Sequence, residues 1–175
     1  MNSTIEACPA IDRNEFRAAL GLFPTGVAVV TAGEEGVESR IGMTITSFNS
    51  VSLDPPLVLF SIDRRALSLP VLRQARMYSI NVLGEQHEHI SNRFATAKGD
   101  KWSATEIEVH DGLPFTLAHA IVSFQCAPYA EYDGGDHLIF VGRVLRIHKQ
   151  EHSAPLVFFG GRYAYLQQPA PAASN

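Results

Sequence analysis

The chain has 175 residues, of which 46% are hydrophobic and 18% are charged, and its formal net charge is −4. A chain of this length is expected to form one domain whose hydrophobic core needs no disulfide or metal. The acidic balance and the lack of a basic patch argue against a nucleic-acid-binding protein. No apolar run is long enough to span a membrane, and the first residues lack the pattern of a signal peptide. The two cysteines, Cys8 and Cys126, are therefore expected to be free thiols in the cytoplasm.

The first predicted element is a helix over residues 12–23, which follows a tail of residues 1–11 that we expect to be disordered. Asp12 can cap this helix, with Glu15 three positions on in the manner of a capping box. Four apolar residues recur at the spacing of one helical face, which is expected to be buried: Phe16, Ala19, Leu20 and Phe23.

Most of the remaining chain is predicted to be strand, in one domain that ends at residue 166 before a second disordered tail at 167–175. The predicted strands cover 27–32, 39–52, 57–62, 77–83, 118–132, 137–149 and 155–166. Two short helices are predicted over 66–74 and 84–95, and residues 97–117 are predicted as a loop. Because the strands do not alternate with long helices, the pattern favours an antiparallel barrel over a doubly wound parallel sheet.

The sequence carries none of the common catalytic motifs. It has no G-x-S-x-G elbow, no G-x-G-x-x-G turn, no P-loop and no cysteine pair with zinc spacing. His87 and His89 would lie on opposite faces of a helix, so they are predicted to be solvated rather than to bind a metal. We therefore expect that any chemistry belongs to a cofactor held by backbone amides and hydroxyl groups.

Two stretches have the composition of a binding site. In GMTITSFNSVSLDPP, residues 42–56, hydroxyl and amide side chains stand among apolar ones, as in a polar-faced edge strand or in the contact face of a planar amphipathic ligand. Arg93 could bind a phosphate or could be an ordinary surface arginine. In DGGDH, residues 133–137, the glycines predict a tight hairpin turn, and Asp136 and His137 could be turn residues or part of a site.

Five segments together resemble the flavin reductase-like family, the reductase components of two-component flavin-dependent monooxygenases. They are FRAALGLFPTGVAVVTA, GMTITSFNSVSLDPPLVLFSI, YSINVLGEQHEHISNRFA, DGGDHLIFVGRV and PLVFFGGRYAYL, in the family's order and spacing over about residues 12–166. The resemblance implies a mainly β fold, a six-stranded antiparallel Greek-key split barrel with a few peripheral helices. It implies a homodimer with the flavin near the interface, hydride transfer from NADH or NADPH to FMN or FAD, and release of reduced flavin to a separate monooxygenase.

The resemblance also assigns residues to the site. Flavin contacts are expected from Arg40, Ile41, Gly42, Met43 and Thr44, from Thr46 and Ser47, from Ser61, Ile62 and Asp63, from Leu67 and Ser68, and from Arg93 and Phe94. Nicotinamide contacts are expected from His137, the one residue assigned to catalysis, and from Phe158, Phe159, Gly160 and Gly161. Hydride transfer between stacked rings needs positioning rather than an acid–base pair, which agrees with the missing motifs. The sequence does not decide between NADH and NADPH or between FMN and FAD.

Two other hypotheses stay open at this point. A flavin- or haem-binding split-barrel carrier or sensor would bind flavin without oxidising NADH, although DGGDH counts against it because a carrier needs no nicotinamide contact. An oxidase of a phosphorylated pyridine compound would need several basic phosphate ligands, and the chain offers few besides Arg64, Arg65 and Arg93.

Overall fold

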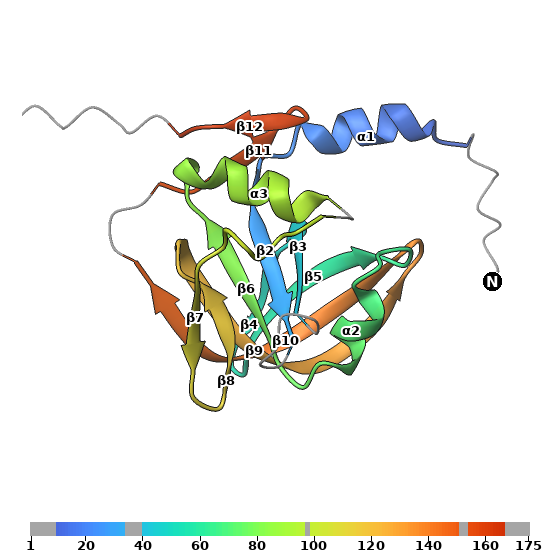
Figure 1. Ribbon diagram of the computed structural model, residues 1–175. Coiled ribbons are helices and arrows are strands. Elements are labelled where there is room, and N and C mark those ends of the chain that lie inside the picture. Colours follow the sequence, from blue (N-terminus) through green and yellow to red (C-terminus); the bar gives the residue numbers. More distant parts are fainter. Residues whose placement is uncertain (1–9, 34–39, 97–98, 151–153, 167–175) are drawn as a thin grey trace, which may run out of the picture.

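The computed structural model describes residues 10–33, 40–96, 99–150 and 154–166. Its elements in chain order are α1 Arg13–Gly21, β1 Thr25–Gly26, β2 Ala28–Ala32, β3 Ile41–Ile45, β4 Asn49–Leu53, β5 Pro56–Asp63, α2 Leu69–Gln74, β6 Tyr78–Leu83, a 3₁₀ turn Glu85–His87, α3 Glu88–Ala95, β7 Ile107–His110, β8 Leu113–Leu117, β9 Ala120–Gly134, β10 His137–Lys149, β11 Val157–Phe159 and β12 Arg162–Ala164 (Figure 1). The predicted C-terminal tail, Cys8 and most of the predicted N-terminal tail lie outside the described residues.

Seven strands form one sheet in the order β3-β2-β6-β9-β10-β5-β4, and all neighbours in it run antiparallel. The predicted mainly β, antiparallel fold is therefore confirmed. The sheet has seven strands rather than six because the extended segment predicted over 39–52 forms two strands, β3 and β4. These two strands lie at the opposite ends of the sheet order.

The β3–β4 connection brings the ends of the sheet together. The hydroxyl of Ser47 donates to the carbonyl of Ser61 at 3.1 Å and accepts from its amide at 2.9 Å, and β3 contacts β5. Ser47 thus acts on β5 as a neighbouring strand would, through one donor and one acceptor. The contact curls the sheet towards a closed barrel, as the split-barrel prediction requires.

The core has two parts. Inside the curled sheet, Phe60 stacks on Phe140 with ring centroids 5.3 Å apart and meets Tyr78 edge-on at 5.4 Å. On the other side of β2 and β6, α3 buries Ile90 and Phe94, the i, i+4 pair expected of an amphipathic helix. This second part fixes α3, and with it the segment that follows, against the sheet.

The predicted burial of the first helix is wrong for a single chain. Asp12 caps α1 as predicted, because its carboxylate accepts from the amides of Asn14 and Glu15 at 2.9 Å. However, α1 has no buried residue, and the four apolar residues of its predicted face are all exposed: Phe16, Ala19, Leu20 and Phe23. Figure 1 shows α1 at one end of the molecule, beside hairpin β11–β12 rather than on the large sheet.

The prediction of a loop over 97–117 is wrong in its second half, where β7 and β8 form a hairpin against β6 and β9. Pro114 within β8 and the turn residues at 111–112 hid these short strands in the sequence. The predicted last strand is likewise two strands, β11 and β12, joined by Gly160 and Gly161 at φ 60° and 76°. Among the described residues, no helix combines the length and hydropathy needed to cross a bilayer.

Candidate functional site

One cavity, of about 460 Å³, opens between β3, the connection from β5 to α2, and the segment after α3. We call it the β3 cavity. Its walls are Arg40, Ile41, Gly42, Met43, Ala66, Leu67, Ser68, Ala95, Gly99, Lys101 and Trp102. Six of these residues, Arg40 to Met43 with Leu67 and Ser68, were predicted to contact one ligand. The fold thus brings together two predicted segments that are well separated in the sequence.

The inner wall of the β3 cavity depends on the absence of a side chain at position 42. A Cβ on Gly42 would lie 2.4 Å from the ring of Phe94 and 3.3 Å from Trp102. These two aromatic rings pack edge to face at 5.1 Å. Gly42 therefore lets the backbone of β3 approach an aromatic pair that is anchored in the core, since Phe94 is 1% exposed.

Five residues of the β3 cavity were not predicted: Ala66, Ala95, Gly99, Lys101 and Trp102. Lys101 donates to the carbonyl of Gly42 at 3.1 Å and lies 6.0 Å from the ring centroid of Phe94, and burial lowers its pKa. Trp102 belongs to the same segment. The segment KGDKW has only the composition of a loop, so no local pattern marked it. Contacts that are distant in the sequence bring it to β3, among them the packing of Phe94 against Trp102 and the hydrogen bond from Lys101 to Gly42.

Three predicted contact residues use their side chains to build the site. Arg93 donates to the carbonyl of Ala104 and to the hydroxyl of Thr105, which ties α3 to the segment that carries Lys101. Phe94 is buried, and the hydroxyl of Thr44 donates to the carbonyl of Ser91 at 2.7 Å. A direct contact of these side chains with a ligand stays a prediction.

A second group of predicted residues lies where β5 ends beside the tip of hairpin β9–β10. His137 is paired in register with Asp63, and its Nδ1 lies 2.7 Å from a carboxylate oxygen of Asp136. This hydrogen bond holds the pKa of Asp136 below its ordinary value. Arg65 donates to both carboxylate oxygens of Asp63 and lowers the pKa of that group in the same way. His137 therefore stands among carboxylates that stay ionised near neutral pH.

Arg64 holds the turn at residues 133–136 in place through three contacts. Its amide donates to the carbonyl of Asp136 at 3.0 Å, its Nε donates to the carbonyl of Gly135 at 2.7 Å, and its guanidinium pairs with the carboxylate of Asp133. The sequence indicated Arg64 only as a possible phosphate ligand, because nothing local connects it to residues 133–136. The chain then passes from Asp63 and Arg64 directly to Ala66, Leu67 and Ser68. One short connection thus joins the His137 turn to the β3 cavity.

The remaining predicted residues lie elsewhere in the single chain. Phe158 packs edge-on against Tyr163 within hairpin β11–β12, and the amide of Gly160 donates to the carbonyl of Gly21 at 2.8 Å. Figure 1 shows this hairpin above α3 and beside α1, whereas the β9–β10 tip lies on the side of α2. Within one chain, the structure does not bring Phe158 to Gly161 together with His137.

Of the two histidines predicted to be solvated, His89 is exposed as predicted, whereas His87 is half-buried. His87 stacks on His119 with ring centroids 5.5 Å apart. Burial and the neighbouring histidine lower its pKa. Across the described residues, no three side chains of histidine, cysteine or carboxylate type are placed to hold a metal ion.

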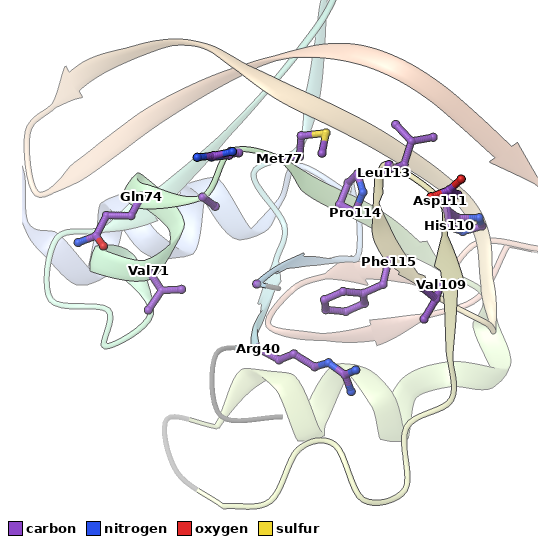
Figure 2. Close-up of a pocket in the computed structure, with 14 residues that line it drawn as sticks. Arg40, Val71, Gln74, Met77, Val109, His110, Asp111, Leu113, Pro114 and Phe115 are labelled. Atoms are coloured by element: carbon purple, nitrogen blue, oxygen red, sulfur yellow. The ribbon is translucent and has the colours of Figure 1, made fainter. Parts of the chain in front are cut away.

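A larger cavity, of about 770 Å³, lies between α2 and hairpin β7–β8 (Figure 2). We call it the hairpin cavity. No residue pattern in the sequence marked it as a site, because most of its walls come from a segment predicted as a helix end and from one predicted as a loop. Arg40 lines both this cavity and the β3 cavity.

Comparisons with known proteins agree on one family. Residues 20–167 match the model of the "Flavin reductase like domain". The chain is 42% identical over 149 residues to "FMN reductase (NADH) SmoA" of Agrobacterium fabrum, covering 85% of this chain and 83% of that protein. It is 37% identical over 158 residues to the reductase component of 4-hydroxyphenylacetate 3-monooxygenase of Thermus thermophilus, covering 90% and 99%. Its fold matches the NADH:FAD oxidoreductase SgcE6 of Streptomyces globisporus in complex with NAD and FAD fragments, with a TM-score of 0.82 at 32% identity, covering 95% and 100%.

Proposed function

Because the chain belongs to the flavin reductase-like family, we propose that it transfers hydride from NADH to FMN or FAD and supplies the reduced flavin to a separate monooxygenase. The relatives named above are an NADH-dependent FMN reductase and the reductase component of a monooxygenase. The proposal keeps the cytoplasmic location expected from the sequence, where NADH and free flavin would both be supplied.

The observation that carries the proposal is the composition of the β3 cavity. Its volume is within the range of small-molecule sites. Ile41, Met43 and Trp102 offer apolar and aromatic surface to a flat ring system, and Ser68 and Lys101 offer donors to carbonyl or phosphate oxygens. The residues present therefore fit a flavin, with Arg40 to Met43, Leu67 and Ser68 as its expected contacts. When bound, the flavin supplies the acceptor for the hydride.

The part of the chain in catalysis is to position the nicotinamide. Nδ1 of His137 is engaged by Asp136, so only its Nε2 edge is left for a hydrogen bond to the carboxamide of NADH. Arg64 fixes the turn that carries His137 relative to β5, and β5 leads into the β3 cavity. No proton needs to be moved by a side chain, so His137 serves as an orienting contact.

We also propose that the protein is a homodimer in which the partner completes the site. In α1, Phe16 is 53%, Leu20 is 57% and the following Phe23 is 71% exposed, so the helix has an apolar face without a cover in one chain. Hairpin β11–β12 lies beside α1 (Figure 1), and Phe158 to Gly161 are far from the His137 turn of their own chain. A second copy that covers α1 would allow these residues to approach the nicotinamide of the partner's site.

The dimer is tested on α1. The double variant F16E/L20E is expected to elute as a monomer in size-exclusion chromatography with light scattering, because two charges would be buried in the interface. Arg17→Glu reverses a charge on the same helix, outside the apolar face, and is expected to stay dimeric. A wild-type monomer, or a double variant that remains a dimer, would contradict the proposal.

The reductase activity is tested with the purified protein and each of FMN, FAD and riboflavin, with NADPH beside NADH. NADH oxidation is expected only when flavin is supplied or retained, and it is followed by the loss of absorbance of NADH. A protein that binds flavin but leaves it oxidised in the presence of NADH and NADPH would instead be a carrier or sensor. No NADH oxidation with any flavin would overturn the proposal.

A further inference from the structure

The hairpin cavity has the lining of a small-molecule site, and apart from Arg40 the proposed reaction does not use the residues of this lining. Figure 2 shows Phe115 and Val109 on the side of hairpin β7–β8, Val71 and Gln74 on the side of α2, and Met77 between them. Its remaining walls are Gly33, Arg40, Ala75, Arg76, His110, Asp111, Gly112, Leu113 and Pro114. At about 770 Å³ the cavity could hold a ring-containing molecule of moderate size.

Arg40 marks the polar end of the hairpin cavity. Its guanidinium carbon lies 5.5 Å from the ring centroid of Phe115, and its Nε is buried with no hydrogen-bond partner among the described residues. A buried donor without a partner costs on the order of 1–3 kcal/mol. Arg40 also lines the cavity, so its guanidinium can offer donors to an acceptor placed beside Phe115.

The charges around the hairpin cavity favour an anion. Among the described residues that line it, two are arginines, Arg40 and Arg76, and one is a carboxylate, Asp111. His110 adds no charge near neutral pH, because burial and the stacked ring of His148, 4.3 Å away, lower its pKa. A guanidinium binds a carboxylate through two parallel hydrogen bonds, which is the geometry that satisfies an arginine best.

We propose that the hairpin cavity is a second binding site, for a planar aromatic carboxylate. The ring of this ligand packs against Phe115, Met77 and the other apolar walls, and its carboxylate meets Arg40, with Arg76 adding to the positive potential. The site is separate from the β3 cavity, since among the described residues Arg40 alone lines both. The proposal does not depend on the reductase activity, because binding alone is claimed.

Benzoate is the probe, and the full chain saturated with FMN is titrated with it by calorimetry. We expect a dissociation constant of about 1 mM or lower, and binding of the neutral analogue benzyl alcohol at least about tenfold weaker, since it lacks the charge-assisted hydrogen bonds. Equal binding of the two compounds, or no binding of benzoate to the FMN-saturated chain, would overturn the proposal. Binding of benzoate to the FMN-free chain alone would place benzoate in the β3 cavity instead.

Val109→Trp locates the site, because Val109 lines the hairpin cavity and the indole of the introduced tryptophan would fill that cavity. This variant is expected to bind benzoate at least about tenfold more weakly than the wild type. Arg76→Ala removes a positive charge without filling the cavity, and it is also expected to weaken benzoate binding. Val51→Trp, the same substitution at an exposed position of β4, is the matched control and should bind as the wild type does. Unchanged binding in both Val109→Trp and Arg76→Ala would overturn the proposal. No NADH is needed, so a failed reductase assay does not affect this result.

Discussion

His137→Ala is expected to raise the KM for NADH about tenfold and to leave the dissociation constant for flavin nearly unchanged. The imidazole is held by Asp136 through Nδ1 at 2.7 Å and stands at the start of β10, opposite Asp63. Loss of one hydrogen bond to the nicotinamide corresponds to about 1.4 kcal/mol, which is a factor of ten in affinity. Steady-state kinetics with varied NADH, together with a flavin titration, measure the two effects separately.

The matched control is His119→Ala, which removes another partly exposed imidazole that also lies beside a carboxylate, Glu106. It is expected to change neither constant. Arg64→Ala should raise the KM for NADH as His137→Ala does, because it frees the turn that carries His137, whereas Arg73→Ala breaks an ion pair to Glu131 further along the same hairpin and should not. Equal losses of NADH and flavin affinity in His137→Ala would mean that His137 has a structural role instead.

The sequence predicted the parts of the site that are continuous in the chain. The stretch 42–56 and the turn before His137 carry local signals, a run of hydroxyl groups in one case and paired glycines in the other. The structure places only the start of the first, Gly42 and Met43, in the wall of the β3 cavity, and it places the second at a hairpin tip. Arg40 and Ile41 followed from the family resemblance alone. Lys101 and Arg64 could not be found this way, because each acts through a partner that is distant in the sequence.

The errors in the fold have a common physical cause. Helical periodicity in α1 predicted an apolar face correctly, but periodicity says only that a face is apolar and not what covers it. Among the described residues of one chain nothing buries Phe16 and Leu20, so the prediction of burial fails while the pattern remains real. Similarly, the extended segment at 39–52 was predicted as extended, but a strand pattern does not show that Ser47 would turn the chain to the other end of the sheet.

Gly42→Ala is expected to destabilise the protein by about 2 kcal/mol, because overpacking a filled core typically costs 1–3 kcal/mol. The new Cβ would stand 2.4 Å from the ring of Phe94, far inside van der Waals contact. Phe94 has little room to retreat, since it is 1% exposed and packs on Trp102. To relieve the clash, either β3 or the Phe94–Trp102 pair must therefore move. Because both line or support the β3 cavity, either movement would change the shape of the cavity. The variant should lower the urea midpoint of unfolding and also weaken flavin binding.

Gly26→Ala is the matched control for this prediction. Gly26 lies in β1, and a Cβ built there meets no atom within 4 Å. Both variants replace glycine by alanine, with the same effect on the unfolded chain. A difference between their free energies of unfolding therefore isolates the clash at position 42. Gly26→Ala is expected to change the free energy of unfolding by less than about 0.5 kcal/mol. If both variants unfolded at the same urea concentration and bound flavin equally, the close approach of β3 to Phe94 would not be what shapes the cavity.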